Sequence, residues 1–480
     1  MISIRNRIGS NWVNAASGET GQTRNPADPA ELLAEYPRAS RAEVRAAIAA
    51  AREALPGWST MPPPARGAIL DKASQLLTAR ADEIAQALTR EEGKTLAEAK
   101  GEVLRARDIF RYFAGEGWRL GGSVLPSNVE GELLYTRREP LGVIAVITPW
   151  NFPIAIPAWK IAPALVYGNT VVFKPAEYTP HTAFLLVEAL VDAGLPPGVI
   201  NFVTGPGANI GDELVSSPEV NGVTFTGSHA VGTTIYAKAS RNLARVQLEM
   251  GGKNPLVVLD DAPLDMAVKI ALTGGFGLTG QACTATSRLI VQAGIAPSFT
   301  EALAQAARVL KVGDGLDAQT QMGPVVSQSQ LDTDLEYIQI GQQEGATLLI
   351  GGKVIRPTSR FLEPTIFTGV ESTMRIAREE IFGPVISIIQ VANLDEAIEA
   401  ANTASFGLAA GVVTNDLKKA LAFANRVEAG VVKVNEPTTG LALQAPFGGF
   451  KQSSANTFKE QGQAAIEFYT RTKTIYLGHG

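Results

Sequence analysis

Cysteine and histidine are nearly missing from this sequence. Its 480 residues contain one cysteine, Cys283, and three histidines. A single cysteine excludes a disulfide within the chain and suits a reducing compartment. We expect no metal site, because zinc and similar ions need a cluster of ligands and these four residues are scattered along the chain.

Long apolar runs and blocks of like charge are also absent. No run reaches the length of about 18 apolar residues that a membrane-spanning helix needs, and the segment MISIRNRIGSNWVNAASGET lacks the apolar core of a secretory signal. The net charge is −5 without a basic patch, so we expect neither nucleic acid nor a membrane as a partner. These absences predict a cytoplasmic protein.

The residues that are present predict a large α/β protein. Hydrophobic residues make up 45% of the chain and charged residues 19%, a composition that can bury large cores. Residues 40–119 carry apolar positions at helical spacing, with Ser40 as a helix cap. After residue 141, short apolar runs alternate with helical stretches: GVIAVITP, NTVVFKP, GVINFVTG, GVTFTG and PLVVL. This alternation is typical of a dinucleotide-binding domain with a parallel sheet.

A second series of strands follows Cys283, with SRLIVQ, ATLLIGG, PVISIIQV and GVVKVN. We therefore predict a dinucleotide-binding domain over 1–120 and 142–250, and a second α/β domain over 251–450. The polar segments LLYTRREP and TRTKTIYLG belong to neither series. Because exposed edge strands are usually paired, we predict that 121–141 and 451–480 bridge to other subunits.

Two segments that follow predicted strands carry candidate polar groups. In TPWNFP, two prolines place Asn151 in a rigid turn, where its amide could donate to an oxyanion; an ordinary turn asparagine is the alternative. In KPAEYTP, Lys174 and Glu177 stand where parallel sheets bind ligands. They could bind ribose hydroxyls, or simply begin a solvated helix.

Two glycine-containing segments suggest phosphate binding. In FTGSHAVG, Gly227 and Ser228 open a predicted helix, which suits a pyrophosphate. The upstream segment GPGANIG, with Gly207, is a near miss to the dinucleotide fingerprint.

An acid and a thiol complete the candidates. Glu249 lies between apolar residues in LEMGGKNP, and burial there would raise its pKa toward that of a general base; a helix cap or an ion pair is the alternative. Cys283 lies in GLTGQACTATSR, which we interpret as a loop leading into a helix whose N–H groups would lower the thiol pKa. A small buried hydrophobe is the alternative.

In this order, TPWNFP, KPAE, FTGS, LEMGGKNP, GQACTA, EEIFGP and APFGGFKQS resemble the motifs of the aldehyde dehydrogenase superfamily. The resemblance runs from about residue 10 to 478. It implies an α/β fold with a Rossmann-like cofactor domain, an α/β catalytic domain and a small β oligomerisation arm. It also implies a homodimer or homotetramer.

The resemblance assigns catalytic roles to Cys283, Glu249, Asn151 and Lys174. Cys283 would attack the aldehyde carbon, while Asn151 and the Cys283 backbone N–H hold the oxyanion. Glu249 would activate the water that hydrolyses the thioester. Family members that pass the acyl group to coenzyme A usually lack this glutamate, so a free acid is the expected product. A non-catalytic protein on this fold would be expected to lose one of these groups.

The resemblance also implies a nicotinamide cofactor. Lys174 and Glu177 match residues at the adenosine ribose, and Glu380 and Phe382 match residues at the nicotinamide ribose. Glu177 favours NAD, because a carboxylate repels a 2′-phosphate; NADP stays open. The full candidate set is Thr148, Pro149, Trp150, Lys174, Glu177, Gly207, Phe225, Gly227, Ser228, Gly251, Glu380 and Phe382.

For the aldehyde, the resemblance places Arg105, Phe152, Trp159, Thr284, Leu441 and Phe447 in the substrate tunnel. Trp159 stands where succinate-semialdehyde dehydrogenases have an arginine, which argues against that substrate. Arg105 could bind a carboxylate, or be a surface arginine. Strings such as RYFAGEGWRLGGSVLPS and QAPFGGFKQSSANTFKEQG resemble members that oxidise 2-oxoglutarate semialdehyde (2,5-dioxopentanoate). An aromatic aldehyde held by Trp159, Phe152 and Phe447 is the alternative.

Overall fold

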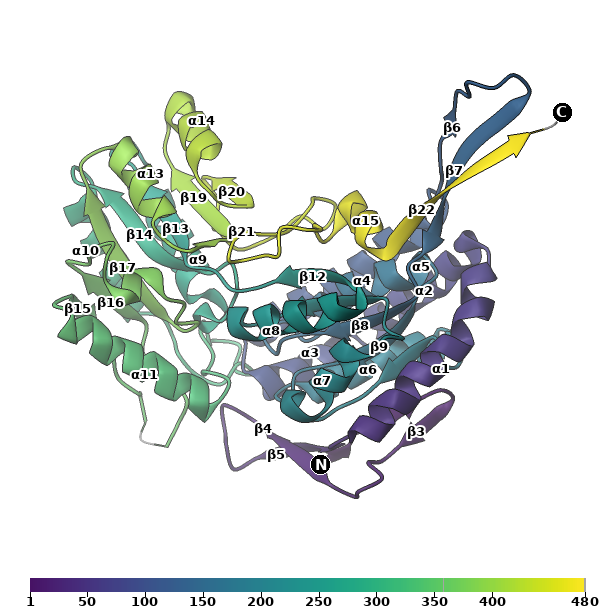
Figure 1. Ribbon diagram of the computed structural model, residues 1–480. Helices are drawn as coiled ribbons and strands as arrows, with labels where there is room; N and C mark the ends of the chain where they lie inside the picture. Colours follow the sequence, from purple (N-terminus) through teal and green to yellow (C-terminus); the bar gives the residue numbers. More distant parts are fainter. Residues whose placement is uncertain (357, 479–480) are drawn as a thin grey trace.

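A seven-stranded sheet forms the centre of the first α/β unit in the computed structural model, which describes residues 1–356 and 358–478 (Figure 1). Its strand order is β12-β11-β8-β9-β10-β2-β3, parallel from β12 to β10 and antiparallel at β2 and β3. The strands are β2 (Asn6–Ile8), β3 (Asn11–Val13), β8 (Val143–Ile147), β9 (Thr170–Lys174), β10 (Ile200–Phe202), β11 (Gly222–Thr226) and β12 (Arg245–Glu249). The predicted parallel sheet is confirmed.

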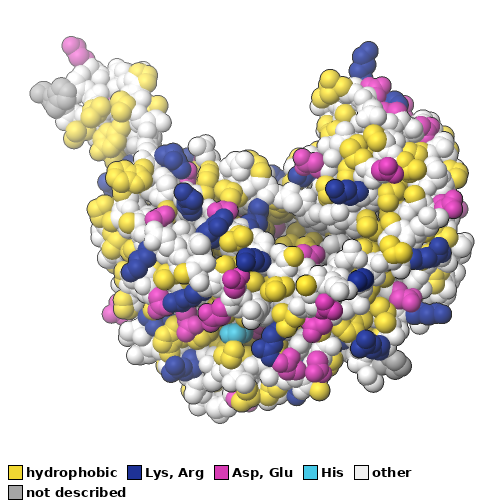
Figure 2. Space-filling view, turned by 180° about the vertical axis from the view of Figure 1, so that it is seen from behind, with side chains coloured by type: hydrophobic (Ala, Val, Ile, Leu, Met, Phe, Trp, Pro, Cys, Tyr) yellow, Lys and Arg dark blue, Asp and Glu magenta, His cyan; other side chains and the backbone are white. Residues whose placement is uncertain are grey.

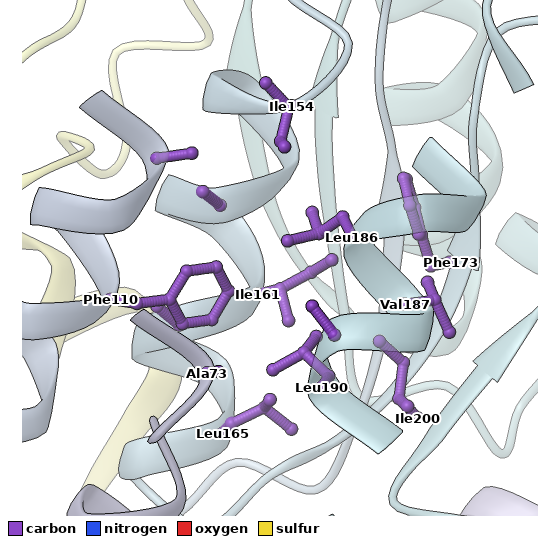
Figure 3. Packing of buried hydrophobic residues seen from close by; sticks show 14 of the residues in the cluster. Ala73, Phe110, Ile154, Ile161, Leu165, Phe173, Leu186, Val187, Leu190 and Ile200 are labelled. Carbon is purple, nitrogen blue, oxygen red and sulfur yellow. The ribbon is translucent and has the colours of Figure 1, made fainter. Parts of the chain in front are cut away.

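Helices cover this sheet and confirm the helical stretch predicted for 40–119. The Ser40 N–H donates to the Glu43 carboxylate at 2.8 Å at the predicted start. The helices are α1 (Arg41–Thr60), α2 (Pro63–Ala79), α3 (Ala81–Glu92), α4 (Leu96–Glu116), α5 (Ala155–Val166), α6 (Pro180–Asp192), α7 (Asp212–Ser216) and α8 (His229–Ala239). Figure 3 shows Phe110, Ile161 and Leu190 converging between α4, α5 and α6. Burial of α5 on all sides makes it a rigid support for the TPWNFP turn that precedes it.

The second unit is built around another seven-stranded sheet, in the order β15-β16-β17-β14-β13-β19-β20, with only β15 antiparallel to its neighbour. Its strands are β13 (Asn254–Val258), β14 (Thr286–Gln292), β15 (Thr347–Ile350), β16 (Thr365–Thr368), β17 (Val385–Val391), β19 (Ala409–Val413) and β20 (Val431–Val434). Its helices are α9 (Leu264–Phe276), α10 (Ala296–Arg308), α11 (Gln328–Gln343), α12 (Arg375–Arg378), α13 (Leu394–Asn402) and α14 (Leu417–Arg426).

One strand assignment was wrong. The alternating pattern groups PLVVL with the first series, although the segment lies within the predicted second domain (251–450); it forms β13, which pairs with β14 and β19 in the second sheet. The last strand of the first sheet is instead β12, RVQLE. Its buried polar residues Gln247 and Glu249 break the apolar pattern by which a central strand is recognised.

An antiparallel arm projects from the first unit, with the chain's C-terminal end at its tip (Figure 1). It comprises β6 (Val124–Leu125), β7 (Glu132–Pro140) and β22 (Thr470–Gly478), and β22 pairs with β7 along its whole length. The segment between β20 and β22 returns from the second unit to the first, through β21 (Phe450–Lys451) and α15 (Ala465–Tyr469). The two polar segments therefore pair with each other, and their role between subunits stays a prediction.

The remaining elements are small. An N-terminal sheet holds β1 (Ile2–Ser3), β4 (Thr20–Arg24) and β5 (Leu32–Pro37), and β18 (Phe406–Gly407) pairs with β21. Within the described residues, no helix has the length and apolar character needed to cross a membrane. Figure 2 shows acidic and basic side chains scattered together over the face seen from behind.

Candidate active site

The carboxyl ends of β8, β9 and β11 meet at a cavity of about 1010 Å³. Ligands bind at this edge of a parallel sheet because the loops after neighbouring strands diverge there. Candidate cofactor residues line it as predicted from the sequence: Thr148, Pro149, Trp150, Lys174, Glu177, Gly207, Phe225, Gly227 and Ser228. The structure therefore gathers segments that are up to eighty residues apart into one wall.

A second cavity of about 260 Å³ adjoins the first, because Pro149, Trp150 and Gly227 line both. Its other walls include Asn151 and Cys283, together with the remaining cofactor candidates Gly251, Glu380 and Phe382. The candidate nucleophile and the candidate oxyanion donor thus share one small chamber at the end of the larger cleft.

Two glycines allow side chains of the cleft wall to pack closely against the backbone. A Cβ on Gly251 would lie 2.0 Å from a Glu380 carboxylate oxygen, and one on Gly227 would lie 2.4 Å from the Phe225 ring. Ser228 precedes α8, whose first-turn N–H groups are free of a side-chain cap. Such N–H groups are suited to a pyrophosphate, as the sequence predicts.

Lys174 and Glu177 both line the larger cavity, and the charge of Glu177 acts on Lys174. Burial lowers the pKa of Lys174 to about 8, and its ammonium donates to the Pro175 carbonyl at 3.0 Å. Glu177 accepts a hydrogen bond from the Tyr36 hydroxyl at 3.2 Å. Tyr36 comes from the N-terminal sheet and also lines the cleft. No local sequence pattern marks it as a cofactor residue.

Asn151 is held rigidly in the turn after β8. Its side-chain Nδ2 donates to the backbone carbonyl of Gln281 at 2.9 Å, and the backbone carbonyl of Asn151 accepts from Lys94 Nζ at 2.6 Å. An amide nitrogen carries two N–H groups. One is therefore used to fix the side chain, and the other remains for an oxyanion.

A buried ion pair holds this turn in place. Lys94 Nζ lies 2.7 Å from Glu102 Oε2, and both side chains are almost fully buried. The other oxygen of Glu102 accepts from the N–H groups of Ile154 and Ala155, each at 3.0 Å, at the start of α5. The sequence analysis missed this pair. The signal was Glu102, an acid facing the apolar side of helix α4.

The expectation that the Cys283 loop leads into a helix is wrong. The loop that carries Cys283 follows a short 3₁₀ turn (Gly277–Gly280) and enters strand β14, rather than a helix. Burial raises the thiol pKa to about 12, with the Glu380, Glu249 and Glu460 charges acting in the same direction and the Thr284 N–H opposing them. A thiol with a raised pKa needs a base to become a nucleophile.

Glu249 ends strand β12 and is buried. Burial, followed by the charge of Glu460, raises its pKa well above the usual range, which confirms the predicted direction. One carboxylate oxygen accepts from the Gly449 N–H at 2.9 Å, and the other from the Ser454 hydroxyl at 3.3 Å. Glu249 thus faces the C-terminal segment in this structure, and the helix-cap alternative is wrong.

A second buried ion pair adjoins Glu249. Lys160 of helix α5 pairs with Glu460 and donates to the Thr224 hydroxyl at 2.9 Å. Neither residue was among the sequence candidates. A lysine inside the apolar run AIPAWKIAPALV was a usable signal, since a charge in such a helix is almost never buried without a partner.

Four of the predicted substrate residues form a chain of contacts. Arg105 donates to the Leu441 carbonyl, and its guanidinium lies 5.9 Å from the centre of the Trp159 ring. The rings of Trp159 and Phe447 are 6.0 Å apart. Arg105 is thus not a surface arginine. The other two candidates lie elsewhere: Phe152 contacts Lys94, with 4.4 Å between ammonium and ring centre, and Thr284 directly follows Cys283.

Comparison with known proteins shows the family. Residues 12–475 match the model of the aldehyde dehydrogenase family, and the chain belongs to this family. It is accordingly an oxidoreductase that acts on aldehydes, as the motifs predict.

Individual relatives are similar over nearly the whole chain. An alpha-ketoglutarate semialdehyde dehydrogenase of Haloferax volcanii is 49% identical over 98% of each chain. An alpha-ketoglutaric semialdehyde dehydrogenase of Bacillus subtilis is 48% identical over 98% of this chain and 97% of the relative. Among solved structures, betaine aldehyde dehydrogenase of Staphylococcus aureus in complex with NAD+ superposes with a TM-score of 0.96, at 36% identity, over 99% of this chain and 95% of that one. The fold prediction is confirmed.

Proposed function

We propose that this protein oxidises 2-oxoglutarate semialdehyde to 2-oxoglutarate with NAD, or alternatively NADP, through a thioester on Cys283. The observation that carries the reaction is the chamber where Cys283 and Asn151 meet at the end of the dinucleotide cleft. The assignment of the substrate is supported by the two semialdehyde dehydrogenases that are nearly half identical to this chain. It is also supported by the position of Arg105 beside Trp159.

In the first step, Cys283 Sγ attacks the aldehyde carbon and forms a thiohemiacetal. The thiol must first lose its proton, and we assign Glu249, whose pKa is raised by burial, as the base. To reach the thiol, Glu249 leaves the Gly449 N–H. The free N–H of Asn151 and the backbone N–H of Cys283 then hold the oxyanion, a contact that contributes about 3 kcal/mol per donor.

The cofactor, when bound, supplies the acceptor for the hydride that leaves the substrate carbon. The residues around the two cavities would hold it: Lys174 and Glu177 at the adenosine ribose, the N-terminus of α8 at the pyrophosphate, and Glu380 at the nicotinamide ribose. Burial raises the pKa of Glu380 to about 7, and the Gly252 N–H fixes its carboxylate at 3.0 Å.

Glu249 first releases the proton of the thiol to solvent. In the last step, its carboxylate takes a proton from a water molecule that attacks the thioester, and this proton passes to the departing sulfur. The C–S bond breaks, the acid leaves and Cys283 is restored. A raised pKa suits this task, because a more basic carboxylate takes a proton from water more readily. Replacement of Cys283 by alanine should abolish aldehyde oxidation, and retained turnover would contradict the mechanism.

The substrate is tested by initial rates on 2-oxoglutarate semialdehyde, succinate semialdehyde, glutarate semialdehyde, an aliphatic aldehyde and benzaldehyde, each with NAD and NADP. We expect 2-oxoglutarate semialdehyde to have the highest kcat/KM and Arg105→Ala to remove its advantage. The Trp159–Phe447 pair favours an aromatic aldehyde as the second candidate. A preference for benzaldehyde that survives Arg105→Ala would establish that candidate instead.

We also propose that the protein forms a homodimer or homotetramer in the cytoplasm, with the arm formed by β7 and β22 between subunits. Leu133, Tyr476 and Leu477 are large apolar side chains exposed on that arm, and such side chains on a projecting element favour burial against a partner. Light scattering on the full chain tests this assembly. We further propose that residues 1–120 and 142–250 form the dinucleotide-binding domain and that residues 251–450 form the catalytic domain.

A further inference from the structure

Gln461 holds a backbone conformation that glutamine rarely adopts. Its φ of 64° and ψ of 165° fall in a region occupied almost only by glycine. The residue is nevertheless 1% exposed and lies in the segment that returns to the first unit, between Glu460 and Gly462. A strained, buried residue persists when its surroundings hold it, and such positions cluster at ligand sites.

The side chain of Gln461 is bound to Arg105. Gln461 Oε1 accepts from Arg105 Nη2 at 2.9 Å, while another Arg105 nitrogen donates to the Leu441 carbonyl. Next in the chain, the Gly462 N–H donates to the Leu443 carbonyl at 3.1 Å. Arg105 is thus held between the loop at 441–443 and the strained segment, and its contact with Gln461 helps to fix the orientation of the guanidinium.

Two donors beside Arg105 have no acceptor. Gln461 Nε2 and Trp159 Nε1 are buried, and neither has a hydrogen-bond partner within residues 1–356 and 358–478. Trp159 presents its ring to the Arg105 guanidinium at 5.9 Å. A buried N–H without a partner costs free energy, and nearly all such groups in proteins are paired. We therefore expect these two donors to bind an acceptor that is not part of the chain.

We infer that Gln461 is a specificity-determining residue that donates its Nε2 hydrogen bond, together with Trp159 Nε1 and Arg105, to the substrate carboxylate at the end remote from the aldehyde. The inference rests on the proposed function and deepens it. A carboxylate is an acceptor with a full negative charge, which matches two unpaired donors beside a guanidinium. An aromatic aldehyde ring offers no acceptor, and would leave both donors unpaired.

The experiment compares kcat/KM for 2-oxoglutarate semialdehyde with kcat/KM for pentanal, which has the same number of carbons and no carboxylate. Gln461→Glu removes the donor and places a negative charge beside Arg105 at almost unchanged volume. We expect the ratio of the two kcat/KM values to fall at least about tenfold, because pentanal lacks the remote carboxylate that the negative charge would repel. Trp159→Phe keeps a ring and should lower the ratio by a smaller factor.

A matched control and a second variant separate specificity from folding. Gln463→Glu makes the same change in charge two residues away at an exposed position, and should leave the ratio as in the wild type. Gln461→Gly removes the donor and relieves the backbone strain, and its thermal unfolding transition shows that the variant is folded. It should nevertheless lose most of the preference for the semialdehyde.

The outcomes distinguish this inference from the function on which it rests. A wild-type protein without preference for the semialdehyde over pentanal would overturn the proposed substrate, and this inference with it. A wild-type preference that stays intact in both Gln461→Glu and Gln461→Gly would overturn the role of Gln461 alone and leave the proposed substrate standing.

Discussion

Lys94 Nζ donates to the backbone carbonyl of Asn151 at 2.6 Å, and thereby ties a buried ammonium to the turn that carries the oxyanion donor. The same ammonium pairs with Glu102 at 2.7 Å. The position of the Asn151 amide therefore depends on a charge pair that never touches the substrate. This arrangement matters because an oxyanion donor contributes only when it is aligned before the reaction begins.

Replacement of Lys94 by methionine should lower both stability and kcat. The change leaves the Glu102 carboxylate buried without its partner, which costs about 3–5 kcal/mol of unfolding free energy. The freed turn should lower kcat by roughly 10²-fold, since Asn151 loses its alignment. Urea unfolding and steady-state kinetics measure the two effects.

The double variant Lys94→Met with Glu102→Gln separates stability from positioning. Removal of both charges should recover most of the unfolding free energy. The kcat should stay low, because the bond to the Asn151 carbonyl is still missing. A double variant with wild-type kcat would show that Lys94 acts through stability alone.

Glu249→Gln should slow release of the acid more than formation of the thioester. An amide cannot take a proton from water, and loss of a general base typically lowers a rate by roughly 10²–10⁴-fold. Stopped-flow absorbance should then show a burst of reduced cofactor equal to the concentration of sites, followed by slow turnover. Because Glu249 is also assigned as the base for the thiol, absence of the burst would mean that its loss slows attack by Cys283 at least as much as release of the acid.

The pH dependence should rise toward alkaline pH. Burial raises the pKa of Cys283 to about 12 and the pKa of Glu249 well above its usual range. Both groups act in their deprotonated forms, and a raised pKa shifts deprotonation to higher pH, so kcat/KM should increase as pH rises through neutrality. Profiles from about pH 6 to about pH 10 measure this. A rate that falls over the same range would contradict these assignments.

Glu177→Gln should shift the cofactor preference toward NADP. Glu177 lines the cleft beside Lys174, and its carboxylate repels a 2′-phosphate, a cost that corresponds to about tenfold or more in the ratio of kcat/KM for NAD to that for NADP. Tyr36→Phe is the control, because it removes the hydrogen bond to Glu177 and keeps the carboxylate. An unchanged ratio in Glu177→Gln would place cofactor discrimination elsewhere.

Residues near one another in the sequence could be predicted well. The helices of 40–119 follow from apolar spacing, and Asn151 follows from a strand ending in a proline-rich turn. Strand β13 was assigned to the wrong sheet because the preceding strand β12 carries buried Gln247 and Glu249. A pattern in the chain identifies a strand, and only its partners show which sheet it joins.

The sequence by itself determined the order of the motifs, the identity of Cys283, Asn151 and Glu249, and hence the family. The tertiary structure decided how these groups behave. Cys283, which is partly exposed in its cavity, has a raised rather than a lowered pKa because packing desolvates the thiol and because the charges of Glu380, Glu249 and Glu460, distant in the chain, act on it. Likewise, Arg105 is bound by Gln461, 356 positions away. Burial and charge act through space, so their effects follow from packing and cannot be obtained from local sequence.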